Sequence, residues 1–324
     1  MERNIDYTLL YRVAKAYYVD KKTQQEIADV ENFSRSQISR LLKRAIEEEL
    51  VTYTLNFPNT VDESVLAEQV RMRLGLEQVV LIPSFYHGAR RTNSGEVYKN
   101  LSLGAAERLG GLLGDAKVIG VGWGRTLYNT SLYIRPQKPV KGRILIPLIG
   151  SLGDNSPMLQ VNTIVDRFGE SFHAGRKYIN LQSLQDRDNF NEDERSSLQS
   201  LAEKWDELDA AIVGVGSAPS SGKNLISEFP QYYKKQVRAS GTVGDILSQF
   251  FYEDGRIFDI DTKFRLLALS LEKLSKVKQV IALAAGADKC RPIRVAARLG
   301  YIKTLVTDYD TANRILRGEG ETEL

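Results

Sequence analysis

Three glycines follow an apolar run between residues 118 and 126, in the order Val-Ile-Gly-Val-Gly-Trp-Gly-Arg-Thr. Glycine lets backbone N–H groups approach a ligand closely, and the positive end of a helix that starts just after them favours an anion. The spacing therefore predicts a phosphate-binding loop with Gly122, Gly124, Arg125 and Thr126 as candidate ligand-binding residues. The same glycines are also compatible with a degenerate dinucleotide fingerprint, which would indicate a dehydrogenase.

The sequence downstream of the glycines argues against the dehydrogenase. Such an enzyme needs an acidic residue about twenty positions further on, where it binds the ribose hydroxyls of the cofactor. In this chain that region is Lys141-Gly-Arg143, which is basic. We therefore expect a phosphate site and no nucleotide cofactor.

The elements around this loop alternate between short apolar runs and helical patterns. Continuous apolar runs joined by helices predict a parallel sheet that is covered on both faces, so we expect a doubly wound, Rossmann-like α/β domain. A helix is expected over 62–74, and residues 250–258 predict a hairpin that turns at Asp254-Gly255. The expected strands are 79–83, 118–121, 144–149, 210–215, 279–285 and 304–307, and the expected helices between or after them are 98–113, 126–134, 160–168, 293–299 and 311–316.

Ligands of such sheets bind beyond the carboxyl ends of the strands, where the loops converge. The loops that follow the expected strands are rich in glycine, hydroxyl, amide and charged groups, which suit the phosphate and the hydroxyls of a sugar phosphate. Besides the first glycine loop they contain Gly150-Ser151, Asp154-Asn155, Gln160, Gly214-Val-Gly216-Ser217, Gly286-Ala-Asp-Lys289 and Thr307-Asp308.

The first sixty residues predict a helix-turn-helix. A helix is expected over 7–19, Thr23 and Glu26 have the spacing of a capping box that starts a second helix, and Ser34 or Ser36 can cap a third. Ile38, Leu41, Leu42, Ala45 and Ile46 are expected to face inward in that third helix, whose first turn would read bases while its positive charges bind phosphates. The candidate DNA-binding residues are Thr23, Gln24, Ser34, Arg35, Ser36, Gln37, Ser39, Arg40 and Lys43.

The positive charge of this segment is local. Residues 33–46 contain four basic and no acidic side chains, whereas residues 1–57 as a whole contain nine of each. A domain without net charge should bind DNA weakly as one copy, so we expect a homo-oligomer, either a dimer or a tetramer. The plainer alternative is a small three-helix bundle with a solvated basic face.

Composition limits the remaining classes of protein. The net charge is +3, 42% of the residues are hydrophobic and 26% are charged, which is ordinary for a soluble globular chain. The single cysteine, Cys290, excludes an internal disulfide. His87 and His173 are isolated, so no metal site is expected. Neither a signal peptide nor a membrane-spanning run is evident, which predicts a cytoplasmic protein.

Several motifs resemble those of the SorC family of bacterial sugar-responsive transcription regulators. In the first sixty residues they are Thr23-Gln-Gln-Glu-Ile-Ala28, Ser34-Arg35 and Ile38-Ser-Arg-Leu-Leu42, although Glu31 stands in the turn where the family usually has leucine. The larger segment resembles the family's effector domain, whose fold is similar to sugar-phosphate isomerases and glucosamine-6-phosphate deaminase. Its matching motifs are Gly122-Trp-Gly-Arg-Thr126, Gln160-Val-Asn-Thr163, Gly214-Val-Gly-Ser217, Val243-Gly-Asp-Ile246 before Phe250-Phe251, and Ala285-Gly-Ala-Asp-Lys289.

The resemblance implies roles for individual residues. Gly124, Arg125 and Thr126 would bind the phosphate, and Gln160 and Asp245 would contact sugar hydroxyls. Lys289 would reach the charged or oxygen-rich end of the ligand. Some relatives have a basic residue where this chain has Ile149, which argues against a bisphosphate bound through that position. Within the family, the sequence resembles regulators of sorbose and sorbitol operons.

Each of these residues also has a structural alternative. Asp245 could cap a helix, Lys289 could be an exposed lysine, and Arg125 could be solvated. We expect Trp123 to pack rather than to stack on a ligand, and we expect Cys290 to be a buried thiol.

The sequence thus predicts a helix-turn-helix over 1–57 and an effector and oligomerisation domain over 58–324. The expected function is a transcriptional regulator of a carbohydrate-utilisation operon, with operator DNA and a phosphorylated sugar or polyol as partners, and with no catalytic residue. The alternative is a sugar-phosphate isomerase or deaminase with an appended DNA-binding domain, for which the sequence shows no histidine–carboxylate pair positioned for proton transfer.

Overall fold

The structure is a computed structural model that describes residues 6–51, 61–83, 94–151, 160–186, 192–221, 231–259 and 264–318. The chain divides into two compact units, Met1–Pro58 and Asn59–Leu324. The loop residues Asp154-Asn155 and His87 lie outside the described residues.

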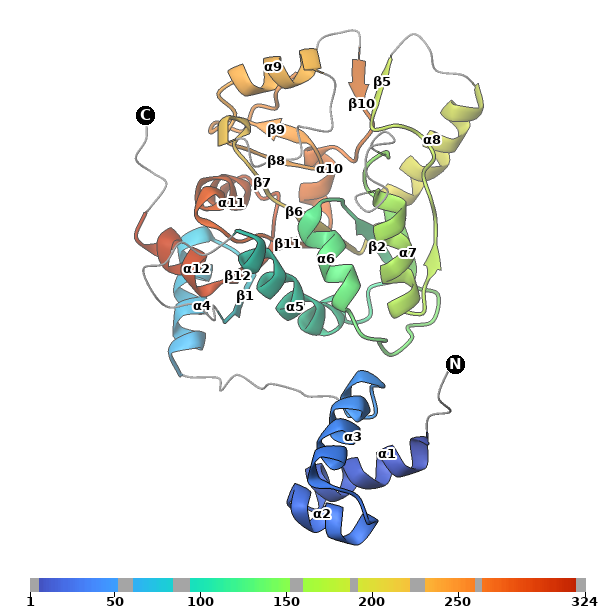
Figure 1. The fold of residues 1–324 in the computed structure, drawn as a ribbon. Coiled ribbons are helices and arrows are strands. Elements are labelled where there is room, and N and C mark those ends of the chain that lie inside the picture. Colours follow the sequence, from blue (N-terminus) through green and yellow to red (C-terminus); the bar gives the residue numbers. More distant parts are fainter. Residues whose placement is uncertain are drawn as a thin grey trace. The chain divides into compact units, whose positions relative to one another are not determined.

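The first unit contains the predicted three helices (Figure 1). They are α1 (Tyr7–Ala14), continued by a π-helical turn (Lys15–Val19), then α2 (Gln24–Glu31) and α3 (Arg35–Glu47). The prediction that Ile46 faces inward is wrong, because 37% of its surface is exposed. The core is formed by Val13, Ile27, Ala28, Ile38 and Leu42.

Local hydrogen bonds fix where α2 and α3 begin. Thr23 and Glu26 form the predicted capping box, and Ser34 forms a second one with Gln37, which identifies Ser34 as the residue that caps α3. Between the two helices, Asn32 has a left-handed backbone (φ 56°), which asparagine tolerates better than most residues. At the position where the family usually has leucine, the Glu31 carboxylate forms an ion pair with Arg12 at 2.6 Å.

The second unit is built on a parallel sheet of seven strands in the order β1-β12-β11-β6-β2-β3-β4. Every neighbouring pair in it is parallel. The predicted doubly wound α/β fold is therefore confirmed. The strands are β1 (Gln78–Ile82), β2 (Val118–Val121), β3 (Ile144–Pro147), β4 (Gly175–Arg176), β6 (Ala210–Gly214), β11 (Gln279–Leu283) and β12 (Thr304–Asp308).

The strand order reverses at β2. After β2 the chain adds β3 and β4 on one side, then returns to place β6, β11 and β12 on the other. Parallel crossovers are right-handed, so connections that run in opposite directions place their helices on opposite faces. Figure 1 shows α5 (Ser94–Leu113), α6 (Arg125–Tyr133) and α7 (Val161–Ser171) in a row on one face. The opposite crossovers contain α8 (Glu192–Trp205), α10 (Leu271–Lys276) and α11 (Cys290–Arg298).

Helices α4 (Val61–Leu74) and α12 (Tyr309–Leu316) pack together beside β1 and β12. In α4, Val70 and Leu74 are buried, whereas Val65 is 48% exposed. In the part of the chain that the structure describes, no helix combines the length and the hydropathy that crossing a membrane requires.

Two small antiparallel sheets complete the unit. One pairs β5 (Leu184–Asp186) with β10 (Phe264–Leu266), and the other has the order β7 (Gly216–Ser217), β8 (Gly244–Ile246), β9 (Gln249–Phe251). Helix α9 (Gln231–Ala239) lies between β7 and β8 in the sequence. The predicted hairpin over 250–258 is confirmed by the antiparallel bridge between Phe251 and Ile257.

The connection from β8 to β9 has an unusual backbone. Leu247 and Ser248 form its two-residue turn, and both have positive φ angles, 51° and 60°. Such turns favour asparagine, aspartate and glycine, so the sequence carried no turn signal here. Strained backbone of this kind is characteristic of binding sites, and both residues line the cavity described next.

Candidate functional site

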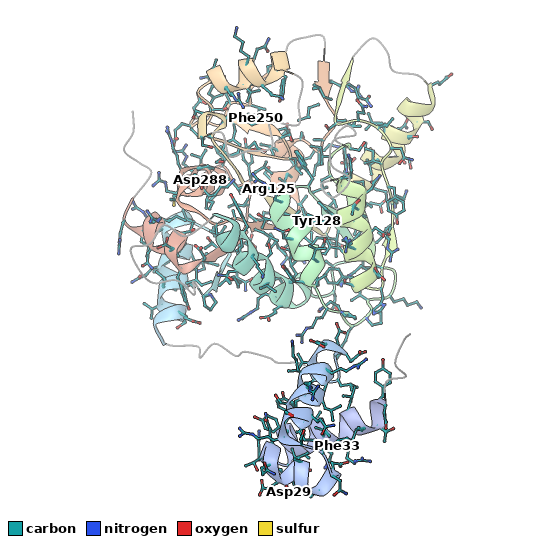
Figure 2. The ribbon with its side chains drawn as sticks, viewed as in Figure 1. Asp29, Phe33, Arg125, Tyr128, Phe250 and Asp288 are labelled. Atoms are coloured by element: carbon teal, nitrogen blue, oxygen red, sulfur yellow. The ribbon has the colours of Figure 1, made fainter. Side chains whose placement is uncertain are left out.

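A cavity lies where the strand order reverses, at the carboxyl ends of β2, β6 and β11. The cavity together with the open solvent at its mouth occupies about 720 Å³. Open α/β sheets bind ligands at this position, because the loops after two neighbouring parallel strands lead to opposite faces of the sheet and leave a crevice between them. The lining residues are Tyr98, Trp123, Gly124, Arg125, Thr126, Leu127, Gly214, Val215, Gly216, Asp245, Leu247, Ser248, Phe250, Leu283, Ala284, Ala285 and Lys289. Figure 2 shows two of them, with Arg125 at the beginning of α6 and Phe250 on β9.

One wall of the cavity is the amino-terminal end of α6. Gly124 is the N-cap residue, and its φ of 122° is a conformation that other residues rarely adopt. A helix leaves its first amide groups without partners inside the helix, and glycine has no side chain with which to cap them. The positive end of α6, formed by Arg125, Thr126 and Leu127, therefore faces the cavity. The first amides of a helix can bind a phosphate in this position.

A carboxyl group and an ammonium group line another part of the same cavity. Asp245 comes from the middle of β8, and Lys289 from a 3₁₀ turn (Ala287–Lys289) that follows β11. Lys289 is only 8% exposed, so the exposed-lysine alternative is wrong. Asp245 lies in a strand, which excludes the helix-capping alternative.

Burial dominates the electrostatics of Asp245. It raises the pKa of this carboxyl from 3.8 to about 6, although the charge of Lys289 and the backbone N–H of Ser248 both act to lower that pKa. Gly216 packs directly on the carboxylate, because a Cβ atom on Gly216 would lie 1.7 Å from Oδ1 of Asp245. The absence of a side chain at Gly216 thus leaves the space that the Asp245 carboxylate occupies.

A tyrosine that the sequence did not single out forms part of the rim. The guanidinium of Arg125 lies 5.8 Å from the centre of the Tyr98 ring. Burial raises the pKa of Tyr98, and the nearby charge of Asp288 raises it further. Tyr98 belongs to α5, so its contact with α6 depends on how the two helices pack and has no signature in the local sequence.

Three of the predicted effector-binding residues do not line the cavity. The N–H of Gly122 donates to the Ile212 carbonyl at 2.8 Å, so this amide is already used within the sheet. Ser217 is fully buried, and its hydroxyl oxygen accepts a hydrogen bond from Ser221 at 3.2 Å. Gln160 is the N-cap residue of α7 and the first residue of the described range 160–186. The other predicted residues, Gly124, Arg125, Thr126, Gly216, Asp245 and Lys289, are brought together.

The structural alternatives for two further residues are resolved. Trp123 is 8% exposed, so it packs into the core as predicted, and it also contributes to the lining of the cavity. Cys290 is a buried free thiol, as predicted. No group of three histidine, cysteine, aspartate or glutamate side chains that could hold a metal occurs among the described residues.

The first unit presents the candidate DNA-binding surface. Arg35, Ser36, Ser39, Arg40 and Lys43 are all exposed on α3. Gln37 is also exposed, but its carbonyl oxygen accepts hydrogen bonds from the N–H and the hydroxyl of Ser34. The predicted base-reading role of Gln37 would therefore use its amide NH₂ group or require the capping box to open.

The two candidate residues at the start of α2 have different environments. The side chain of Thr23 exchanges hydrogen bonds with Glu26 in the capping box, whereas Gln24 follows it as the first residue of the helix. Both lie beside Arg35 in a shallow groove of this unit.

Comparison with known proteins identifies the family. Residues 59–317 match the domain family described as "Putative sugar-binding domain". The sorbitol operon regulator of Klebsiella pneumoniae is 27% identical over 98% of this chain and 100% of its own length. The deoxyribonucleoside regulator of Bacillus subtilis (strain 168) is 25% identical over 95% of this chain and 97% of its own.

A solved structure extends the similarity to both units. The crystal structure of the full-length sorbitol operon regulator SorC from Klebsiella pneumoniae matches with a TM-score of 0.74 and 26% identity, covering 97% of this chain and all of that one. The resemblance drawn from the motifs is therefore confirmed. This chain belongs to the sugar-binding domain family and, within it, to the SorC family of transcriptional regulators.

Proposed function

We propose that this protein is a DNA-binding transcriptional regulator of a carbohydrate-utilisation operon, and that a phosphorylated sugar or polyol controls its DNA binding or its assembly. The observation that carries the proposal is the cavity of the second unit. It has a positive helix end on one wall, and the Asp245 carboxyl and Lys289 ammonium groups elsewhere in its lining, in a chain that also contains a capped helix-turn-helix. The names of the two relatives support a regulator of sugar or nucleoside use.

The chemistry of the cavity favours a ligand with a phosphate at one end and hydroxyl groups at the other. The first amides of α6, with Arg125 and the Thr126 hydroxyl, can donate hydrogen bonds to phosphate oxygens. Asp245 and Lys289 can pair with hydroxyl or carbonyl oxygens further along the molecule. We place Gln160 in the same role, with the weaker support that it begins the helix after β3.

We further propose that the protein is not an enzyme, that it acts in the cytoplasm and that it works as a homo-oligomer. Ligand binding can alter DNA binding only if the ligand prefers one arrangement of the chains over another. The competing enzyme hypothesis predicts turnover of a sugar phosphate by the purified protein, which ³¹P NMR would detect.

A thermal-shift screen followed by calorimetry tests the proposal. Phosphorylated hexoses, pentoses and hexitols are screened against the full-length protein, because a ligand at a hundredfold excess over its Kd stabilises the folded state by about 2.7 kcal/mol. The affinity of the best ligand is then measured for Thr126→Ala, Asp245→Ala and Lys289→Ala. We expect each substitution to weaken ligand binding while DNA binding is retained.

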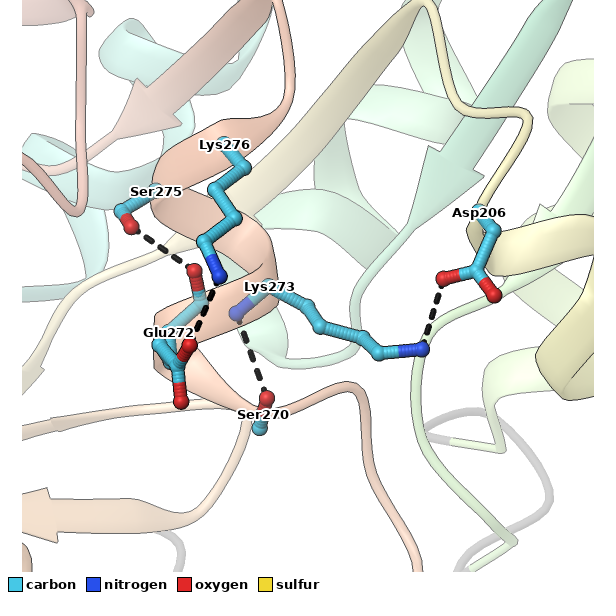
Figure 3. Close-up of polar contacts among 6 residues, drawn as sticks. All are labelled: Asp206, Ser270, Glu272, Lys273, Ser275 and Lys276. Atoms are coloured by element: carbon cyan, nitrogen blue, oxygen red, sulfur yellow. Dashed lines mark hydrogen bonds and ion pairs between the residues drawn. The ribbon is translucent and has the colours of Figure 1, made fainter.

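Lys276→Ala provides the matched control for Lys289→Ala. Lys276 lies on α10, is 69% exposed and pairs with Glu272 at 2.7 Å (Figure 3). It does not line the cavity, so its loss should leave ligand affinity unchanged. If none of the three cavity variants alters the affinity, the ligand binds elsewhere and the assignment of this cavity is wrong.

A further inference from the structure

A groove in the first unit is lined by cationic side chains that form no ion pair with the described residues of that unit. Its lining residues, which we call the tyrosine-lysine groove, are Tyr17, Tyr18, Lys21, Lys22, Thr23, Gln24, Gln25 and Arg35. Between residues 6 and 51, Arg12, Lys15, Lys43 and Arg44 form ion pairs within the unit. The other cationic side chains of that range, Lys21, Lys22, Arg35 and Arg40, form none there, and all but Arg40 line this groove.

Two carboxylates near the groove have partners within the unit. Asp20 binds Lys15 at 3.1 Å. Glu26 accepts hydrogen bonds from the backbone N–H and the hydroxyl of Thr23, which hold the pKa of its carboxyl below the usual value, and the charge of Lys22 contributes to this. Glu26 thus keeps its negative charge, but three cationic side chains, Lys21, Lys22 and Arg35, line the groove, so positive charge is in excess on this exposed surface.

Two helices begin at the groove and add to this charge. Gln24 is the first residue of α2 and Arg35 is the first residue of α3, so the positive ends of both helices contribute. The exposed lysines precede α2 directly, while the tyrosines come from the π-helical turn that ends α1. A strongly electropositive groove with hydroxyl donors is complementary to a phosphodiester.

The backbone at Lys21 points to the same use. Lys21 has a φ of 58°, in the left-handed region where a helix end favours glycine or asparagine. The N–H of Lys22 closes this end by donating to the Ala16 carbonyl at 3.0 Å. A lysine here is less favourable for folding than glycine would be, so its side chain is expected to serve a purpose other than stability.

We propose that Lys21 and Lys22 each bind a backbone phosphate of the operator beside the bases that α3 reads, so that the turn between α1 and α2 anchors the recognition helix on the DNA. The inference rests on the proposed function, because it requires a DNA-binding protein. The position of Arg35 indicates that the phosphate belongs to DNA. Arg35 lines the tyrosine-lysine groove and is also the first residue of α3, the helix expected to enter the major groove of DNA.

The test compares full-length variants on two duplexes. One duplex is selected from a random-sequence pool by the wild-type protein, and the other is a scrambled sequence of the same length and composition. The variants are Lys21→Gly and Lys22→Ala, with Lys276→Ala as the charge-matched control in the second unit and Arg40→Ala as the test of DNA reading by α3. Affinities are measured between 50 and 200 mM salt, together with melting temperatures.

A lysine that binds a phosphate contributes about 0.9 to the slope of log affinity against log salt concentration. Each lysine variant should therefore have a shallower slope by about 0.9, so that the affinity advantage of the wild type shrinks about 3.5-fold over the fourfold salt range. The loss should be equal on both duplexes, because phosphates carry no sequence information. Lys21→Gly should melt at the same temperature as the wild type or higher, which separates lost binding from lost folding.

Several results would overturn the proposal. Unchanged slopes for both lysine variants, while Arg40→Ala weakens binding, would reject the groove and leave the proposed function intact. A loss confined to the selected duplex would assign the lysines to base reading instead. A slope change in Lys276→Ala of the same size would attribute the effect to net charge. Failure of the wild-type protein to select any duplex would reject the proposed function together with this inference.

Discussion

The carboxyl group of Asp245 links the chemistry of the cavity to the stability of the second unit. Its pKa of about 6 in the folded protein lies above the ordinary value of 3.8, because burial disfavours the charged form. Between these two pH values the folded chain binds more protons than the unfolded chain, so the free energy of unfolding falls as pH rises. The stabilising contribution is complete below about pH 4 and is lost as pH rises through 6.

Asp245→Asn should remove this pH dependence. For a shift of this size the wild-type protein should lose up to about 3 kcal/mol of stability through this group between pH 4 and pH 7, and the variant should lack that loss. Urea denaturation at a series of pH values measures both curves. If they run parallel, Asp245 ionises with the same pKa in the folded and unfolded chains, and our view of its environment is wrong.

The sequence predicted individual site residues to the extent that local chemistry defines them. Gly124 and Thr126, which line the cavity, were predicted because a glycine loop before a helix is a local pattern, and Lys289, which also lines it, was predicted through its motif. Gly122 and Ser217 share that local chemistry, yet the N–H of one and the hydroxyl of the other are satisfied inside the fold. Which of two similar groups faces a cavity depends on tertiary contacts that a single sequence does not contain.

At the scale of elements, the proposed DNA recognition depends on α3. Its exposed face carries Arg35 and Arg40, and the capping box formed by Ser34 fixes its first turn. Arg35 begins the helix, where side chains of a recognition helix reach base edges. By contrast, Arg40 donates to the Ser36 carbonyl at 3.3 Å and lies one turn further along.

Arg35→Ala should therefore change specificity as well as affinity. A side chain that reads a base contributes about 1–3 kcal/mol of discrimination, so the variant should bind the selected duplex about 5- to 150-fold more weakly and accept other bases at one position. Binding to duplexes substituted at each position measures this. An equal loss on every duplex would show that Arg35 contacts only the DNA backbone.

Elements were predictable where their patterns are long or strongly apolar. The strand over 118–121 agrees with β2 because a buried parallel strand needs a continuous apolar run. The hairpin of β8 and β9 was missed because Leu247 and Ser248 are not turn formers, and this error hid the position of Asp245. The strands β4, β5 and β10 were also missed, since two or three residues are too few for periodicity to be recognised.

At the scale of the whole molecule, the proposed ligand binding and DNA binding belong to two different compact units. The second unit provides a cavity suited to a phosphorylated ligand, and the first provides a basic helix and the tyrosine-lysine groove. Neither surface explains regulation by itself. Regulation requires that ligand binding and DNA binding favour different arrangements of the chains, and the resulting coupling must be reciprocal.

The central claim is this coupling, and calorimetry on the full-length protein tests it directly. The Kd of the effector found by the thermal-shift screen is measured for the protein alone and for the protein saturated with its selected duplex. We predict two different values, and we predict that the effector changes DNA affinity by the same factor, typically about 5- to 150-fold. Equal effector affinities in the two states would contradict the account, because a ligand that does not distinguish them cannot control DNA binding.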